Sequence, residues 1–393
     1  MDGMKGATWL LVGLVLTPFL DGCSGGYPES TVSVDSAGVR ISTYSGDARL
    51  LPWGLDTTFL LGGEGDGPQG FYKARLPLVD VDAKGRIYVL NDTQKEVSVF
   101  DSSGANLGVY GREGGGPGEF RFPVSISAAD SGIFYVMDGD KRALVSIGLD
   151  GRVRPSIGYP FSVINIGFPH FQIGNTGIGL WARDRYLGAE QADNRKDRLW
   201  WISDRDTAEL VPASPSPMVS AVYPKCNMSF SIAVPFSPFP RWSQWGDRVA
   251  VNVWSEYRLE VFDAGKHILS IRQPELTDPM TEDEAVALLE ARGFPGGPCN
   301  SDAREVIRRH GYHPRPQVVR NVVLDPSSSL WVEYQGVEGD RRIDLYLENG
   351  NYAGSLDEEF PMPLDFLPDG RLVIQVKDTF DVERLGIARL LRQ

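Results

Sequence analysis

The sequence predicts an all-β fold assembled from repeated units, each built from several short strands. Two observations support this prediction. Residues that favour strands and tight turns are plentiful, and stretches with helical periodicity are few. In addition, the glycine-rich stretch 111–120 (GREGGGPGEF) has a counterpart at 62–71 (GGEGDGPQGF).

The two copies also agree beyond their glycines. The Gly-Pro pair at 67–68 recurs 49 positions later at 116–117, and Pro77 recurs 46 positions later as Pro123. Each copy continues with a strand, a turn that carries Asp and Gly, a second strand, and a hairpin between a third and a fourth strand. A period of this length is typical of a propeller blade. Because the stretch recurs, contains a proline and precedes no helix, we interpret it as a turn between blades and not as a phosphate-binding loop.

Six such units account for the chain. We place them near 73–110, 120–160, 165–212, 218–275, 316–358 and 362–393. The last unit lacks an outer strand, which the leading segments 39–45 (VRISTYS) and 57–63 (TTFLLGG) can supply. Strands from both ends of the chain then close the ring and remove free sheet edges. The sequence thus predicts a six-bladed β-propeller over 31–393, with seven blades as the alternative because 165–245 is hard to parse.

The strand pattern is interrupted over about 279–313. Thr281 and Glu284 have the spacing of a capping box, and Gly293 follows as a C-cap. A second helix is expected from Ser301 to Gly311. We expect a small helical insertion between blades, which either caps one mouth of the propeller and contacts a partner or covers a sheet edge.

The N-terminus has the pattern of a bacterial lipoprotein signal. The apolar run Ala7–Leu20 is too short for a transmembrane helix and suits a signal peptide. It leads into LDGC, which ends at Cys23 and resembles a lipoprotein box. We therefore expect a signal peptide at 1–22, lipid attachment to Cys23 and a tether at 23–30. Simple secretion is the alternative.

The other two cysteines, Cys226 and Cys299, form a pair in what is then an oxidising compartment. We expect either a disulfide, which would attach the helical insertion to the preceding blade, or two separate buried thiols. No Cys-x-x-Cys motif occurs, so a zinc ribbon or a thioredoxin-like site is not expected.

The units over 57–155 resemble NHL-type repeats, since GREGGGPGEF is followed by the strand–Asp–strand pattern and VFDSSG. The whole chain is similar to bacterial six-bladed β-propeller lipoproteins whose function is uncharacterised. The resemblance implies the fold and a location in the cell envelope, where a lipid-anchored protein faces the periplasm or the exterior. It implies no particular activity.

Asp80 and Asp365 are the best-placed candidates for catalysis. Each lies five positions before a hairpin glycine, inside the innermost strand of blades that are neighbours in a closed ring. Carboxylates that project into the channel can hold a cation such as calcium or act as an acid/base pair. Alternatively, both are solvated residues of the channel wall. Two carboxylates are too few for a calcium cage, so we predict no metal and no other cofactor.

Tryptophans are concentrated between residues 181 and 254. Aromatic side chains suit sugars and peptides, so Trp242 and Trp245 are candidate ligand-binding residues. They belong to the proline-interrupted segment 236–245, which we expect to be a loop. Packing between blades is the alternative role.

The formal charge of −13 argues against a nucleic-acid-binding protein, which needs a basic surface. The sequence contains neither His-Glu-x-x-His nor Gly-x-Ser-x-Gly. We therefore expect a monomeric, non-catalytic module that binds a protein, peptide or glycan of the envelope. The alternative is a lactonase-like hydrolase or lyase with a cation, such as calcium, in the central channel.

Overall fold

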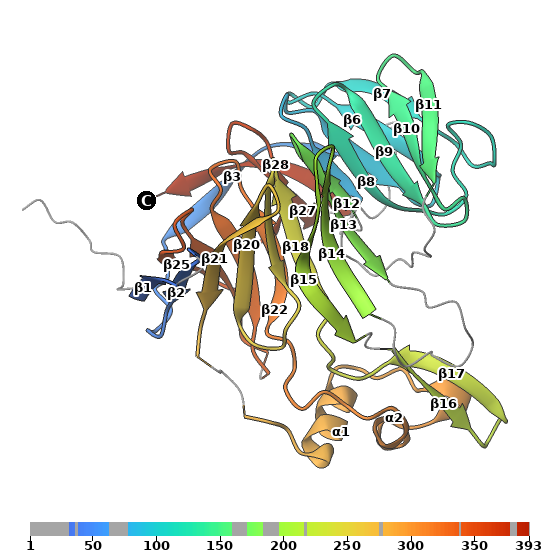
Figure 1. Cartoon of the computed structure of the whole chain (residues 1–393), viewed down its shortest axis with the longest axis vertical. Helices are drawn as coiled ribbons and strands as arrows, with labels where there is room; N and C mark the ends of the chain where they lie inside the picture. Colours follow the sequence, from blue (N-terminus) through green and yellow to red (C-terminus); the bar gives the residue numbers. More distant parts are fainter. Residues whose placement is uncertain are drawn as a thin grey trace, which may run out of the picture.

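The computed structural model describes residues 31–35, 38–62, 78–158, 171–183, 196–215, 218–274, 278–337, 339–377 and 383–392. The signal sequence expected at 1–22 and the tether expected at 23–30, with Cys23, lie outside them. The described residues form six blades of four strands (Figure 1). The prediction of an all-β, six-bladed propeller with a small helical insertion is confirmed.

The first three blades follow one another along the chain, and each runs from an inner to an outer strand. Blade 1 comprises β4 (Val79–Val81), β5 (Ile87–Asn91), β6 (Glu96–Phe100) and β7 (Asn106–Tyr110). Blade 2 comprises β8 (Pro123–Ala129), β9 (Ile133–Asp138), β10 (Ala143–Gly148) and β11 (Val153–Gly158). Blade 3 comprises β12 (Phe171–Ile173), β13 (Gly177–Arg183), β14 (Lys196–Ser203) and β15 (Thr207–Pro215). The glycine-rich stretch 111–120 connects blades 1 and 2, as predicted.

Longer segments precede blades 4 and 5, whereas blade 6 follows blade 5 closely. Blade 4 comprises β18 (Arg241–Trp245), β19 (Arg248–Asn252), β20 (Arg258–Asp263) and β21 (Lys266–Arg272). Blade 5 comprises β22 (Val319–Leu324), β23 (Leu330–Gln335), β24 (Arg341–Tyr346) and β25 (Tyr352–Leu356). Blade 6 comprises β26 (Pro363–Phe366), β27 (Leu372–Lys377), β28 (Glu383–Arg392) and β3 (Trp53–Leu61).

Strand β3 closes the ring from the N-terminal side. It pairs antiparallel with β28, from Leu61 opposite Leu385 to Trp53 opposite Arg392, and Figure 1 shows the two strands side by side. The expectation that segment 39–45 contributes to this closure is wrong. Instead, β2 (Arg40–Thr43) pairs in parallel with β21 of blade 4. The reason is that β3 already occupies the free edge of β28, whereas the outer edge of blade 4 is open.

The N-terminal segment protects the outer edges of three successive blades. A hairpin of β1 (Thr31–Val34) and β2 lies on blade 4. The chain then crosses blade 5, where Leu51 N–H donates to the Ser355 carbonyl at 2.8 Å and the ring of Tyr44 stacks on Tyr352 with centroids 4.0 Å apart. It continues as β3 on blade 6. Free strand edges invite pairing with other chains, so this path removes three of them.

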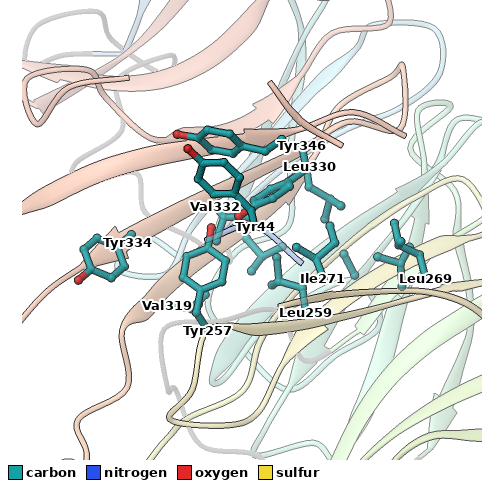
Figure 2. Packing of buried hydrophobic residues seen from close by; sticks show 14 of the residues in the cluster. Tyr44, Tyr257, Leu259, Leu269, Ile271, Val319, Leu330, Val332, Tyr334 and Tyr346 are labelled. Carbon is teal, nitrogen blue, oxygen red and sulfur yellow. The ribbon is translucent and has the colours of Figure 1, made fainter. Parts of the chain in front are cut away.

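Apolar side chains fill the space between neighbouring blades. Figure 2 shows the contact of blades 4 and 5, where Leu259 and Ile271 pack against Val319 and Val332. Tyrosines from both blades surround this contact, among them Tyr257. Because a blade is covered on both faces, its central strands are largely apolar: all five residues of β5 are buried, and only the last, Asn91, has a fully polar side chain.

The segments before and after blade 4 form an appendage outside the ring, which comprises β16, β17, α1 and α2. Strands β16 (Met218–Tyr223) and β17 (Met228–Ala233) make a separate hairpin. Helices α1 (Glu282–Ala291) and α2 (Ala303–His310) follow blade 4, and Ala285 and Ile307 pack at their contact. Figure 1 shows the four elements together beyond the ends of the blades. No described helix is long and apolar enough to cross a bilayer.

Three sequence predictions change here. The unit placed at 218–275 is two structures, because blade 4 begins at Arg241 and the preceding hairpin belongs to the appendage. The segment 236–245 is not wholly a loop: Pro238 and Pro240 delay the strand, and β18 begins directly after them. The capping box of α1 is confirmed at Thr281, whereas the N-cap of α2 is Asp302 and not Ser301.

Candidate functional site

A belt of hydrogen bonds joins the inner strands around the channel. An inner strand has no strand beyond it, so its backbone groups need other partners. In four successive pairs of blades, a polar side chain of one blade accepts a hydrogen bond from a backbone N–H of the following blade. The contacts are Asp80 Oδ2 with Ala128 N at 2.6 Å, Ser127 Oγ with Ile173 N at 3.0 Å, Gln172 Oε1 with Gln244 N at 2.7 Å and Ser243 Oγ with Leu324 N at 3.2 Å. We call these contacts the inter-blade belt.

The belt also crosses the closure between blades 6 and 1. There the carboxylate of Asp365 accepts the N–H of Val81. The equivalent position of blade 5 is Val323, which has no polar side chain, and the N–H of Phe366 bonds to its own neighbour Asp365 at 2.8 Å. Five of the six blade contacts therefore carry the belt.

Asp80 and Asp365, the candidate catalytic residues, lie in neighbouring blades as predicted. Asp80 is not a solvated wall residue: it is 8% exposed, and its carboxylate faces blade 2, where it also accepts a hydrogen bond from the hydroxyl of Ser127 at 3.1 Å. Asp365 is half-buried. Burial raises the pKa of Asp80 to about 7, although the bonds from Ala128 and Ser127 oppose the shift. Burial, and then the charge of Asp80, raise the pKa of Asp365 well above its ordinary value. Both carboxyl groups thus favour the neutral, protonated form more than an exposed aspartate does.

The channel opens into a cavity of about 820 Å³ at the end where the inner strands turn into the second strands of their blades. We call it the channel mouth. Residues of all six blades line it, chiefly from the hairpin turns that follow β4, β8, β12 and β18. Asp80 and Asp365 lie at its inner end.

The channel mouth is acidic. Asp82 is buried and binds Arg86, whose Nε lies 2.6 Å from its carboxylate. The only arginine in the lining of the described cavity, Arg248, pairs with Glu348 at 3.0 Å. Three further carboxylates in the lining have no cation paired with them among the described residues. They are Asp130, which accepts Ala83 N–H at 2.9 Å, Asp247, which accepts Thr176 N–H at 2.7 Å, and the exposed Asp263.

The two candidate tryptophans lie in different environments. Trp242 is 2% exposed and packs between blades 3 and 4 with Val251 and Trp181, so it cannot present a face to a ligand. Trp245, at the end of β18, is partly buried and lines the channel mouth. Only Trp245 therefore belongs to the site. The sequence analysis missed Ser127 and Gln172, although they follow Asp80 and Ser127 at spacings of 47 and 45, which match the repeat.

The two remaining cysteines are joined in the appendage. Cys226, in the turn between β16 and β17, is bonded to Cys299 between α1 and α2, with Cα atoms 6.0 Å apart. The disulfide attaches the helices to the β16–β17 hairpin rather than to a blade. Within the described part of the chain, no group of three or more His, Cys, Asp or Glu side chains has a geometry that could hold a metal ion.

Comparisons with known proteins agree with this architecture. A family model described as a 6-bladed beta-propeller (DUF5128) matches residues 78–177, which contain blades 1 and 2. A human protein, the E3 ubiquitin-protein ligase NHLRC1, is 28% identical over 79 residues. The aligned part is 20% of this chain and 20% of that protein, so the chain covers about a fifth of this curated relative.

Two solved structures share the fold over most of their length. One is an exported protein of Bacteroides fragilis, 14% identical, with a TM-score of 0.52 over 90% of this chain and 99% of that one. The other is a member of the duf4221 family from Bacteroides vulgatus, 12% identical, with a TM-score of 0.51 over 87% of this chain and 99% of that one. At these identities the likeness concerns the fold alone. The chain is a six-bladed β-propeller similar to NHL-repeat proteins.

Proposed function

We propose that this protein is a non-catalytic binding module, held in the bacterial cell envelope by a lipid on Cys23, whose channel mouth binds a positively charged segment of a peptide or protein. One observation carries the proposal: a cavity of about 820 Å³ is lined by all six blades and is open at the surface. This volume is typical of ligand sites. A rigid ring that presents many turns at one mouth suits binding by contacts from several blades at once.

The charge of the channel mouth indicates the ligand. Asp130, Asp247 and Asp263 face the cavity without a paired cation among the described residues, and Arg248 is neutralised by Glu348. A lysine or arginine side chain of a ligand would meet these carboxylates as charge-assisted hydrogen-bond acceptors. Trp245 at the same mouth offers an apolar surface to the stem of such a side chain.

The belt argues for binding rather than for catalysis. A hydrolase or lyase would need the raised pKa of Asp80 and Asp365 for proton transfer. Both carboxylates, however, accept backbone N–H groups of the next blade. Their role in holding neighbouring blades together accounts for both carboxylates without a reaction, and it leaves fewer oxygen lone pairs for a substrate.

The location rests on the N-terminal sequence and on one similar structure. The apolar run that ends at Cys23 has the order of a lipoprotein signal. A protein of the same fold is described as exported. The Cys226–Cys299 disulfide is compatible with an oxidising compartment outside the cytoplasm.

Titration calorimetry with tetralysine tests the binding site, with Nε-acetylated tetralysine as the uncharged comparison. We expect the charged peptide to bind at physiological ionic strength and the acetylated peptide to bind at least about tenfold more weakly, since each lost charge-assisted contact is worth about 1.5–3 kcal/mol. The variant Asp130→Asn/Asp247→Asn, in which amide oxygens can still accept the turn hydrogen bonds, should lose the same preference.

A matched control separates the site from the overall negative charge. Glu358→Gln/Glu359→Gln removes the same charge from exposed residues between blades 5 and 6. This control should bind tetralysine as the wild type does. Equal weakening in both double variants, or no preference for the charged peptide, would contradict the proposal.

A further inference from the structure

A second charged cluster lies at the opposite end of the channel. Arg241 is the first residue of β18, whose last residue, Trp245, lines the channel mouth. Four residues of extended strand span about 13 Å, so Arg241 lies well away from that mouth. Arg320 is the second residue of β22, in the neighbouring blade. Both strands start where the chain enters them from the appendage.

Arg241 and Arg320 lie on neighbouring strands of blades 4 and 5, and the charge of Arg320 acts on Arg241. Arg241 precedes Ser243 by two positions and therefore projects from the same face of β18 as Ser243, which contacts Leu324 of β22. Arg320 is the extra residue of a β-bulge, because the pairing of β22 with β23 shifts between Val319 and Asn321. Bulges redirect side chains and often lie beside functional sites.

The two guanidinium groups are incompletely satisfied. The Nε atoms of Arg241 and Arg320 are both buried, and neither has a hydrogen-bond partner among the described residues. Buried donors without partners are rare in folded proteins and call for an explanation such as a ligand. Burial, and then the charge of Arg320, lower the pKa of Arg241 to about 10. Burial, and then the charge of Arg292, lower the pKa of Arg320.

The surrounding charges do not balance this cluster. Arg292 caps the C-terminal end of α1 and lies over the ring of Phe236, 5.4 Å from its centroid. Among the described residues, Glu333 is the one carboxylate that acts on both Arg241 and Arg320, and Arg341 already binds it at 2.7 Å. The charges of three arginines therefore act on one another in a chain whose net charge is −13.

We infer that Arg241, Arg320 and Arg292 form an anion-binding site, at the junction of the appendage with blades 4 and 5, that takes a phosphate-class dianion. Guanidinium groups bind such oxyanions through paired N–H donors, and the buried Nε atoms supply donors that no other described residue uses. A dianion neutralises more of the cluster than a single carboxylate does. Arg241 and Arg320 are both partly exposed, so a ligand can reach their guanidinium groups from solvent.

Equilibrium dialysis of the wild-type protein with radiolabelled inorganic phosphate, at ionic strength held constant with chloride, tests the site. We expect saturable binding of one phosphate, displacement by sulfate and little displacement by acetate. Arg241→Gln/Arg320→Gln should weaken binding at least about tenfold. Arg152→Gln/Arg205→Gln removes the same charge from exposed loop positions and should bind as the wild type does.

The outcomes are decisive in either direction. The double variant should be at least as stable as the wild type in chloride, because it removes two buried, mutually repelling charges. Should it fail to fold, Arg292→Gln at the exposed helix end gives the answer, with a smaller loss of phosphate affinity expected. No saturable binding up to about 10 mM phosphate, a weak interaction by any standard, would overturn the inference, as would unchanged affinity in the variants or equal displacement by acetate. Asp130→Asn/Asp247→Asn at the other mouth should leave phosphate binding unchanged, so this test is independent of the proposed function.

Discussion

Asp80 and Asp365 occupy equivalent positions in the first and last blades, and each accepts a backbone N–H from the blade that follows it. The charge of Asp80 contributes to the raised pKa of Asp365. The ring therefore closes at two acids, one buried and one half-buried, whose raised pKa values favour protonation, and this links the stability of the closure to pH.

Substitution Asp80→Asn should flatten the pH dependence of stability. The pKa of Asp80 is about 7 in the folded protein and about 3.9 in an unfolded chain. Between these pH values the folded protein keeps a proton on Asp80 that the unfolded chain has lost. Protonation of Asp80 therefore stabilises the folded state fully below about pH 4, and this stabilisation is lost as the pH rises to about 7. An asparagine resembles the neutral acid, so the free energy of unfolding of the variant should exceed that of the wild type at pH 8 by up to about 4 kcal/mol. Urea unfolding at pH 5 and pH 8 measures the difference.

The control for this experiment is Asp204→Asn, at an exposed turn of blade 3. It should keep the wild-type dependence on pH. Parallel pH profiles for the wild type and Asp80→Asn would mean that Asp80 is ionised at neutral pH in the folded state, contrary to the account.

Two serines of β8 distinguish the contribution of a belt hydrogen bond to stability from the contribution of burial alone. Ser127→Ala leaves the N–H of Ile173 without its acceptor and should cost about 1–3 kcal/mol of unfolding free energy. Ser125→Ala removes an equally buried hydroxyl that has no hydrogen-bond partner in the described structure, so its effect should be near zero or stabilising. Chemical denaturation of both variants makes the comparison. Equal losses would show that the belt adds nothing beyond packing.

Removal of the disulfide should loosen the appendage and leave the ring intact. The bond joins residues separated by 73 positions, and the chain-entropy model assigns such a cross-link about 4 kcal/mol. In Cys226→Ala/Cys299→Ala, backbone amides of β16, β17 and α2 should exchange hydrogen faster, while those of β5 and β23 keep their protection. Mass spectrometry of peptic fragments measures both. Faster exchange throughout the blades would contradict a separate appendage.

Lipid attachment to Cys23 can be tested separately. In a bacterial host, Cys23→Ser should abolish incorporation of a labelled fatty acid and move the protein from the membrane to the soluble fraction. Cys226→Ser/Cys299→Ser, which keeps Cys23, should remain labelled. Persistent labelling of Cys23→Ser would contradict the anchor.

The sequence was sufficient for the fold because the blade repeats are local. Turn glycines and prolines recur at a nearly constant spacing, and each unit repeats the same order of strands, so blades 1 and 2 could be placed closely. It was insufficient around blade 4. The β16–β17 hairpin has the same alternating pattern as a blade strand pair, and only its packing against α2 distinguishes it.

The candidate site was predicted in part. The spacing to the hairpin glycine placed Asp80 and Asp365 in adjacent inner strands, but not the direction of their side chains toward the next blade. Trp242 and Trp245 are three residues apart, and whether each lies between blades or at the channel mouth depends on the register of β18. The arginine cluster was not predicted, because Arg241 and Arg320 lie on strands that meet only at the contact of blades 4 and 5, and Arg292 belongs to the appendage.

Hydrogen exchange in the presence of saturating tetralysine tests the central claim most directly, because it locates a ligand without reference to affinity. We predict slower exchange confined to the turns that line the channel mouth, at 82–86, 129–132, 174–177 and 246–248, with no change in the appendage. Protection confined to β16, β17, α1 and α2, or no protection at any turn of the mouth, would contradict the account.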